Sequence, residues 1–155
     1  MNTNDIKYMS DTNKTAILIK LASLEFEKIA NPILAEYELT ASQYRILKFL
    51  YSRQNVSSRV VDIEKQFSIT HPTALGLLDK LEKNGFVTKI ANPDDARSKL
   101  VSLTEKAKVM QPAVESVGER VDNIMTENLS EQEKIQLISL LKKLLNKNTA
   151  ENRNI

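Results

Sequence analysis

The sequence predicts a mainly α-helical protein with one small β-hairpin, an α+β fold, and three observations lead to this prediction. Long segments repeat apolar residues at the three- and four-residue spacing of amphipathic helices. Two of these segments begin with a Ser or Thr that is followed three residues later by Glu or Gln, which is a helix start signal. β-Branched residues gather on both sides of one turn-forming segment, within residues 86–103. Helices therefore dominate, and the hairpin interrupts them once.

The composition excludes several classes of function. The 155 residues suffice for one domain with a real core. No run of about 20 apolar residues and no basic-then-apolar leader occurs, so we expect a cytoplasmic protein without a membrane span. The chain has no Cys, and its one histidine, His71, leaves no imidazole cluster for zinc or copper. We therefore expect neither a metal nor a cofactor.

The first long helix is expected over about residues 14–38, after a flexible N-terminus over residues 1–13. Pro32 should bend this helix near its end, because proline removes one backbone hydrogen bond. The apolar side of the helix comprises Ile17, Leu21, Leu24, Ile29, Ile33, Leu34 and Tyr37.

The second and third helices follow at once. Thr40 and Gln43 form a capping box, which predicts a helix over about 41–53. Ser57 or Ser58 is expected to cap a short third helix. The residues expected on their apolar sides are Tyr44, Leu47, Leu50 and Tyr51 in the second helix, and Val60, Ile63 and Phe67 in the third.

The segment at residues 69–85, ITHPTALGLLDKLEKNG, has the start signal, the apolar stripe and the stop signal of a fourth helix. Thr70 or His71 can accept the first free amides, and the Asn-Gly pair ends the helix in the usual way. The apolar stripe is Ala74, Leu77, Leu78 and Leu81. Two short helices joined by a tight turn predict a helix-turn-helix.

The remaining chain predicts a hairpin and two more helices. FVTKI and KLVSL are the expected strands, and residues 91–98 between them form a long charged tip. Thr104 caps a long helix with a kink at Pro112, and Ser130 opens the last helix with a capping box. Residues 148–155 form a flexible tail. The apolar faces are Val109, Val117, Val121, Ile124 and Met125, then Ile135, Ile138, Leu141, Leu144 and Leu145.

Basic side chains are most frequent in the middle of the chain. Residues 40–99 carry ten Lys or Arg against six Asp or Glu, although the net charge of the whole chain is only +2. This distribution suits a protein whose middle faces a polyanion. On charge alone, an ordinary solvated surface is the favoured interpretation.

The order of elements, together with ITHPTALGLLDKLEKNGFV and NPDDARSKLVSLTEKA, resembles the MarR family of bacterial winged-helix transcriptional regulators. The resemblance covers about residues 14–147. Its most specific part is the wing, where the family pattern Asp-Pro-x-Asp-x-Arg, ending in Val-x-Leu-Thr, stands here as Asn92-Pro93-Asp94-Asp95-Ala96-Arg97, ending in Val101-Ser102-Leu103-Thr104.

The resemblance implies a winged helix-turn-helix with long N- and C-terminal dimerisation helices. The DNA-binding lobe would span about residues 40–103, and the dimerisation helices about 14–38 and 104–147. The implied function is that of a homodimeric repressor on a palindromic operator in double-stranded DNA. The apolar terminal helices agree with a dimer, whereas packing on their own domain is the open alternative.

The chain departs from the family pattern at four positions. Glu64 stands where a small residue is usual, and Ser68 where glycine is frequent in the turn. In the wing, Asn92 replaces the usual Asp, and Ala96 stands where a second Arg is common. The first two departures affect the packing between the two helices of the helix-turn-helix. Ala96 removes one cation from the wing.

Five residues at the start of the fourth helix are assigned to DNA. Thr70, His71 and Thr73 lie at its exposed end, and His71 could donate a hydrogen bond to guanine N7 or to a phosphate. For Thr70, capping is the favoured role. Leu75 and Gly76 fall off the stripe, so Leu75 meets either a thymine methyl or the edge of the core, and Gly76 allows close approach of the backbone.

Charged residues supply the other expected DNA contacts. Arg97 at the wing tip is expected to enter the minor groove, oriented by Asp95. Lys80, Lys99 and Arg59 are expected to meet phosphates. A plain solvated surface is the competing interpretation for these three, as it is for Lys83.

A small-molecule effector is implied by the resemblance, with small aromatic or lipophilic acids as the ligand class. Tyr37, Tyr44, Arg45 and Tyr51 are candidates for such a site, although a core or interface role is favoured for each. A homodimer is a further expected partner, and the alternatives for the effector are such a small molecule or no ligand at all.

Two other classes of function compete with DNA binding. The fold could serve as a winged-helix module for protein–protein interaction without specific DNA binding, but the basic lobe and Arg97 favour DNA. An enzyme is the weakest alternative, because Asp94 and Asp95 are adjacent on a loop and no nucleophile, phosphate loop or metal set accompanies them.

Overall fold

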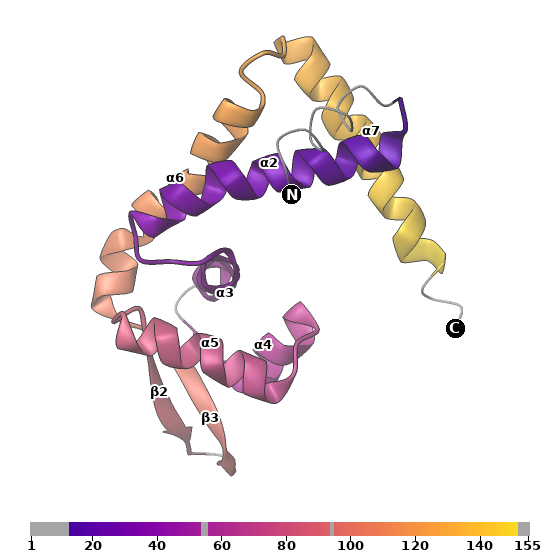
Figure 1. Ribbon diagram of the computed structural model, residues 1–155. Helices are drawn as coiled ribbons and strands as arrows, with labels where there is room; N and C mark the ends of the chain where they lie inside the picture. Colours follow the sequence, from indigo (N-terminus) through magenta and orange to yellow (C-terminus); the bar gives the residue numbers. More distant parts are fainter. Residues whose placement is uncertain (1–12, 54–55, 94, 152–155) are drawn as a thin grey trace. The chain divides into compact units, whose positions relative to one another are not determined.

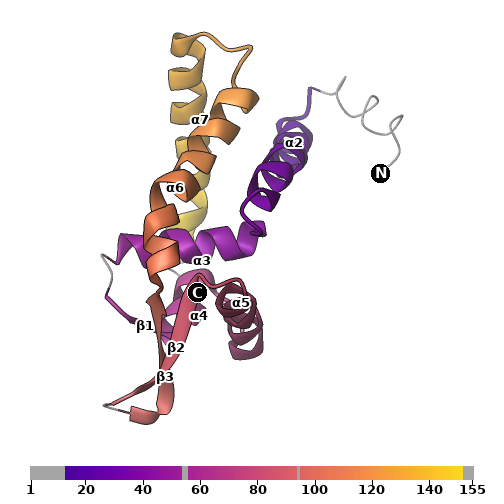
Figure 2. The same ribbon diagram turned by 90° about the vertical axis from the view of Figure 1, so that its left-hand side faces the viewer.

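The computed structural model describes residues 13–53, 56–93 and 95–151, of which 96–98 and 146–151 are described by their backbone alone. Strands are interspersed among the helices along the chain, and the three strands form one sheet (Figures 1 and 2). The chain divides into two compact units, residues 1–121 and 122–155. The predicted mainly helical α+β class is confirmed.

The N-terminal helices lie close to the predicted positions. α2 spans Thr15–Ala35 with Pro32 inside it, and α3 spans Ala41–Ser52. The capping box of Thr40 and Gln43 is present, with the Thr40 N–H donating to Gln43 Oε1 at 2.8 Å. Most of the predicted N-terminus, residues 1–12, lies outside the described residues.

The two helices of the helix-turn-helix are α4, Val60–Phe67, and α5, His71–Lys83. The prediction of a serine cap on α4 is wrong. Arg59 is the capping residue, and its N–H donates to the Asp62 carboxylate at 3.3 Å. Ser58 instead belongs to a strand, because its backbone pairs with a residue far along the chain.

The sheet contains one strand that the sequence did not reveal. β1 is Ser58–Arg59, β2 is Val87–Asn92 and β3 is Asp95–Leu103, in the spatial order β1-β3-β2 with antiparallel pairing. The predicted long tip over 91–98 is wrong, since Asn92 already pairs with Asp95. The β2–β3 hairpin projects beyond the helices of its lobe (Figures 1 and 2).

The core of the lobe joins α5 to the sheet and to the neighbouring helices. Phe86, three residues after the end of α5, is fully buried, as are the stripe residues Ala74, Leu78 and Leu81, whereas Leu77 is half-buried. Other buried side chains come from α3, α4, β3 and α6, namely Ile46, Leu47, Leu50, Ile63, Val101, Ala107, Val114 and Val117. This core fixes the orientation of α5.

α6 spans Glu105–Met125 and α7 spans Glu131–Glu151. Thr104 caps α6 as predicted, accepting from the Ala107 N–H at 3.1 Å, and Ser130 forms the predicted capping box with Glu133. Val109 was placed on the apolar face, but it is 80% exposed.

The end of α7 differs from the sequence prediction. The helix continues through residues 148–151, which the sequence analysis assigned to a tail, and residues 152–155 lie outside the described ones. None of the helices in the described part of the chain is both long enough and apolar enough to cross a membrane.

Candidate nucleic-acid interface

The turn of the helix-turn-helix directs the start of α5 to the surface. Ser68 ends α4 in the left-handed conformation, with φ of 51°. The backbone carbonyl of Glu64 accepts the N–H of Ser68 and, at 3.1 Å, that of Ile69. α5 then begins only three residues after Ser68, so its first turn is held against α4.

The first turn of α5 is exposed, as a surface that reads DNA requires. Thr70, His71 and Thr73 are all exposed. Thr70 occupies the capping position, but its side chain makes no capping hydrogen bond, so the capping role favoured for it is wrong. Its Oγ1 instead lies 2.9 Å from Oγ1 of Thr73. Their roles toward DNA stay predictions.

Further along α5, Leu75 is half-buried and Gly76 is exposed. A Cβ added to Gly76 would meet no atom of the chain within 4 Å. Packing within the protein therefore does not explain a mid-helix glycine, which costs about 1 kcal/mol relative to alanine. This observation is consistent with an external surface that approaches the backbone at Gly76.

A charged cluster, Asp79, Glu82 and Lys89, fastens β2 to α5. The Lys89 ammonium contacts the Asp79 carboxylate and lies 3.0 Å from Glu82 Oε2, while the Lys89 backbone N–H donates to Glu82 Oε1 at 2.9 Å. The hydrogen bonds from Lys89 hold the pKa of Glu82 below its ordinary value. No pattern in the sequence predicts this cluster, which fixes the hairpin to the helix.

The cations assigned to DNA have different surroundings. Lys80 and Lys83 on α5 and Lys99 on β3 are exposed. Arg59 is paired, because its Nη2 lies 2.8 Å from Asp62 Oδ1 and its Nε lies 3.1 Å from Asp62 Oδ2. A phosphate would therefore have to compete with Asp62 for this guanidinium.

The wing residues lie at the start of β3. Asp95 is exposed, and its charge helps to raise the pKa of Arg59, after the larger effects of Asp62. Arg97 follows two residues later on the same strand, and its side chain lies outside the described part of the structure. The predicted orientation of Arg97 by Asp95 stays a prediction.

The four proposed effector residues have different surroundings. Tyr51 is buried and donates to the Ala107 carbonyl at 2.8 Å, and burial raises its pKa to about 12. Burial also raises the pKa of Tyr44, which lies near Gly118 on α6. Tyr37, two residues beyond the end of α2, is half-buried. Arg45 has a different setting, at the edge of a hollow.

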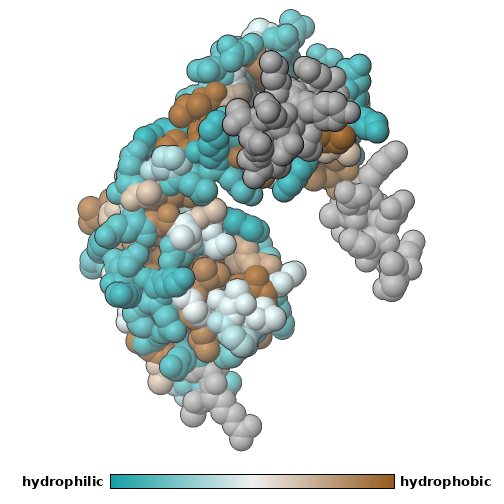
Figure 3. Space-filling model, viewed as in Figure 1, coloured by the Kyte–Doolittle hydropathy of each residue, from teal (hydrophilic) through white to brown (hydrophobic). Residues whose placement is uncertain are grey.

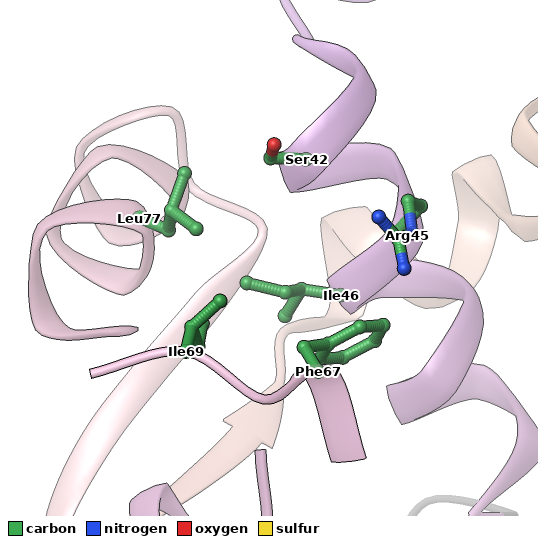
Figure 4. A pocket seen from close by; sticks show the side chains of 6 residues that line it. All are labelled: Ser42, Arg45, Ile46, Phe67, Ile69 and Leu77. Carbon is green, nitrogen blue, oxygen red and sulfur yellow. The ribbon is translucent and has the colours of Figure 1, made fainter. Parts of the chain in front are cut away.

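A shallow hollow, open to solvent, lies between α3 and the helix-turn-helix (Figure 4). Ser42 and Arg45 come from α3, and the Arg45 guanidinium lies 5.3 Å from the centre of the Phe67 ring. No carboxylate pairs with Arg45 among the described residues. The apolar lining comprises Ile46, Phe67, Ile69 and Leu77.

Within the described residues, no group of three or more His, Asp or Glu side chains is arranged to hold a metal ion. The exposed start of α5 and the projecting hairpin belong to one lobe and are both fixed to its core.

Comparison with known proteins reveals clear similarities. A sequence model described as MarR family matches residues 39–99, which contain the helix-turn-helix and most of the hairpin. The multiple antibiotic resistance protein MarR of Escherichia coli (strain K12) is 29% identical over 129 residues, which cover 83% of this chain and 88% of that protein. The transcriptional regulator SarZ of Staphylococcus aureus (strain USA300) is 26% identical over 137 residues, which cover 88% of this chain and 90% of SarZ.

Two similar solved structures contain DNA. A mutant MarR from E. coli complexed with operator DNA has a TM-score of 0.69 and 29% identity, covering 83% of this chain and 91% of that chain. The S. aureus MepR–DNA complex has a TM-score of 0.74 and 26% identity, covering 88% of this chain and 99% of that chain. In both similar proteins, then, a related fold was crystallised on DNA.

Proposed function

Because this chain belongs to the MarR family of winged-helix transcriptional regulators, we propose that it is a homodimeric repressor of a palindromic operator, released by a small aromatic or lipophilic ligand. Proteins of this family are DNA-binding regulators rather than enzymes, and this chain shares that general function. The observation that carries the proposal is that one lobe presents both the exposed first turn of α5 and a projecting hairpin.

In the proposed complex, α5 enters the major groove and the hairpin reaches the flanking minor groove. His71 and Thr73 face base edges or phosphates, Gly76 allows the backbone to approach, and Arg97 enters the minor groove. Lys80 and Lys99 contact phosphates, as does Arg59 once it leaves Asp62. The basic lobe supplies the electrostatic part of the affinity.

Exposed apolar side chains support the homodimer. On α2, Leu18 and Phe26 are 42% and 46% exposed. On α7, Ile135, Leu137, Ile138, Leu140, Leu141, Leu144 and Leu145 are all exposed. On the face drawn in Figure 3, hydrophobic patches interrupt a mainly hydrophilic surface. So much apolar surface on one helix is typical of an interface, and a second copy of the chain would cover it.

The DNA-binding part is tested by fluorescence anisotropy. The protein is titrated against a duplex from upstream of its own gene and against a scrambled duplex, at two salt concentrations. We expect tight binding to the first duplex that weakens steeply with salt, because phosphate contacts release counterions. Arg97→Ala should weaken binding at least about tenfold, since both wings of a dimer lose a minor-groove cation.

Lys28→Ala is the control for that experiment, because Lys28 is an exposed cation on α2, outside the surface proposed to contact DNA. It should leave affinity within about twofold of the wild type. Equal affinity for both duplexes at each salt concentration would contradict operator recognition, and an unchanged affinity for Arg97→Ala would contradict the role of the wing.

The hollow between α3 and the helix-turn-helix is the site we propose for the effector. A flat or lipophilic carboxylate would place its apolar body on Phe67, Ile69 and Leu77, and its charge beside Arg45. Since Leu77 belongs to α5 and Ile69 to the turn, a molecule held there contacts the proposed DNA-reading helix. Its binding can therefore change how α5 meets DNA.

Titration with benzoate and with octanoate tests this site by calorimetry and by DNA anisotropy. We expect at least one of them to bind and to weaken DNA binding about tenfold at saturation. Arg45→Gln should weaken carboxylate binding by a similar factor, whereas Arg53→Gln, at the end of α3 and outside the hollow, should not. If neither acid binds, the effector part of the proposal is wrong and the DNA-binding part still stands.

A further inference from the structure

Glu64 connects the two helices of the helix-turn-helix through both its backbone and its side chain. Its carbonyl oxygen holds the turn by accepting from Ser68 and Ile69. Its carboxylate Oε1 lies 2.6 Å from Nδ1 of His71, the first residue of α5. The Glu64 side chain is 19% exposed and that of His71 is 61% exposed. One side of the imidazole is therefore engaged with the protein and the rest is open.

This contact decides which nitrogen of His71 is left for an outside partner. A carboxylate has acceptors only, so the hydrogen between the two atoms belongs to Nδ1, which donates it. A neutral imidazole carries a single N–H, and Nε2 is then an acceptor. In the neutral ring, this geometry therefore makes Nδ1 the hydrogen-bond donor and Nε2 the acceptor.

We propose that Glu64 is a positioning residue for base reading: it holds neutral His71 in the Nδ1–H tautomer, so that Nε2 accepts a hydrogen bond from an exocyclic amine of a base. This inference rests on the DNA-binding function proposed above. It changes the expectation from sequence, in which His71 donates to guanine N7 or to a phosphate.

The chemistry of the major groove defines the partner. Adenine presents its N6 amine there and cytosine its N4 amine, whereas guanine presents the acceptors N7 and O6. A lone pair on Nε2 is complementary to the amines and is repelled by guanine N7 and by phosphate oxygens. His71 therefore favours adenine or cytosine at one position of each half-site.

The tautomer can be measured directly, because His71 is the only histidine of the chain. Long-range ¹H–¹⁵N spectra of the full-length protein, labelled at histidine, report this ring alone. At a pH high enough for a neutral ring, the wild type should show a protonated Nδ1 and an unprotonated Nε2. Glu64→Ala should shift the ring toward the Nε2–H form that free histidine prefers.

Gln66→Ala is the matched control, since Gln66 is exposed on the same helix. Its spectrum should equal that of the wild type. A wild-type ring protonated mainly at Nε2 would overturn the proposal, as would a Glu64→Ala ring with an unchanged tautomer.

Selection from a random duplex library at the same pH tests the reading of bases. The wild type should enrich sites with adenine or cytosine at one position of each half-site. Glu64→Ala and His71→Ala should each lose about fivefold of that preference. The double variant should lose no more than either single one, because the two residues act as a unit.

The two experiments separate the inference from the function on which it rests. If Glu64→Ala selects the same bases with the same weights, Glu64 has no part in base reading. If the wild type enriches no sequence, the proposed operator recognition fails and the base-reading role fails with it. In that case the spectra still decide whether Glu64 fixes the tautomer.

Discussion

Ile138→Glu is expected to convert the protein into a monomer and to weaken operator binding at least about 100-fold. Ile138 is 50% exposed near the middle of α7, and Leu141 beside it is 39% exposed. In the proposed homodimer these side chains are covered by the second copy. A carboxylate at this position would lose its hydration without gaining a partner, which strongly disfavours association.

The large loss in affinity follows from the loss of bivalent binding. Two linked lobes bind two half-sites with a high effective concentration for the second, and a monomer loses this advantage of about 10² to 10⁴. Light scattering gives the mass of the variant, circular dichroism its helix content, and anisotropy its affinity.

Gln136→Glu is the control for Ile138→Glu, because it adds the same charge to the same helix at an exposed polar position. It should remain dimeric and bind DNA within a few-fold of the wild type. A monomeric Ile138→Glu that binds the operator as tightly as the wild type would contradict the role of the dimer. An Ile138→Glu variant of unchanged mass would place the interface elsewhere.

The sequence predicts well those features that depend on neighbours along the chain. The capping boxes at Thr40 and Ser130 each join residues three positions apart, and both occur as predicted. The stripe of α5 was predicted from the helical period, and Ala74, Leu78 and Leu81 are indeed fully buried. Proximity in sequence is sufficient for such features because the helix itself brings the residues together.

Sequence patterns do not predict the features that depend on contacts between distant segments of the chain. Ser58 pairs with Val101, and no local pattern could reveal a two-residue strand whose partner lies more than 40 positions away. Val109 was expected on the apolar face of α6 but is exposed, because the buried side of that helix runs through Ala107 and Val114 instead. The Glu64–His71 contact spans seven residues and two helices, so it depends on the angle at which the turn joins them.

Phe86→Ala is expected to lower the free energy of unfolding by about 3–5 kcal/mol. Phe86 is fully buried, and its N–H donates to the Leu81 carbonyl at 2.9 Å. Its own carbonyl accepts the N–H of Thr104 at 3.1 Å, directly before α6. Truncation leaves a cavity where α5, the sheet and α6 meet, and urea denaturation at fixed protein concentration measures the loss.

Ile90→Ala is the matched comparison, since Ile90 lies in the same hairpin but is 47% exposed. It should cost less than about 1 kcal/mol, because about half of its surface is already in water. Equal losses for the two variants would contradict the assigned core.

A domain is typically stable by only about 5–15 kcal/mol, so Phe86→Ala should also release α5 from the sheet. Operator affinity should then fall even though Phe86 itself is buried beneath the DNA-facing surface, because a helix can read a groove only while the core behind it holds its orientation.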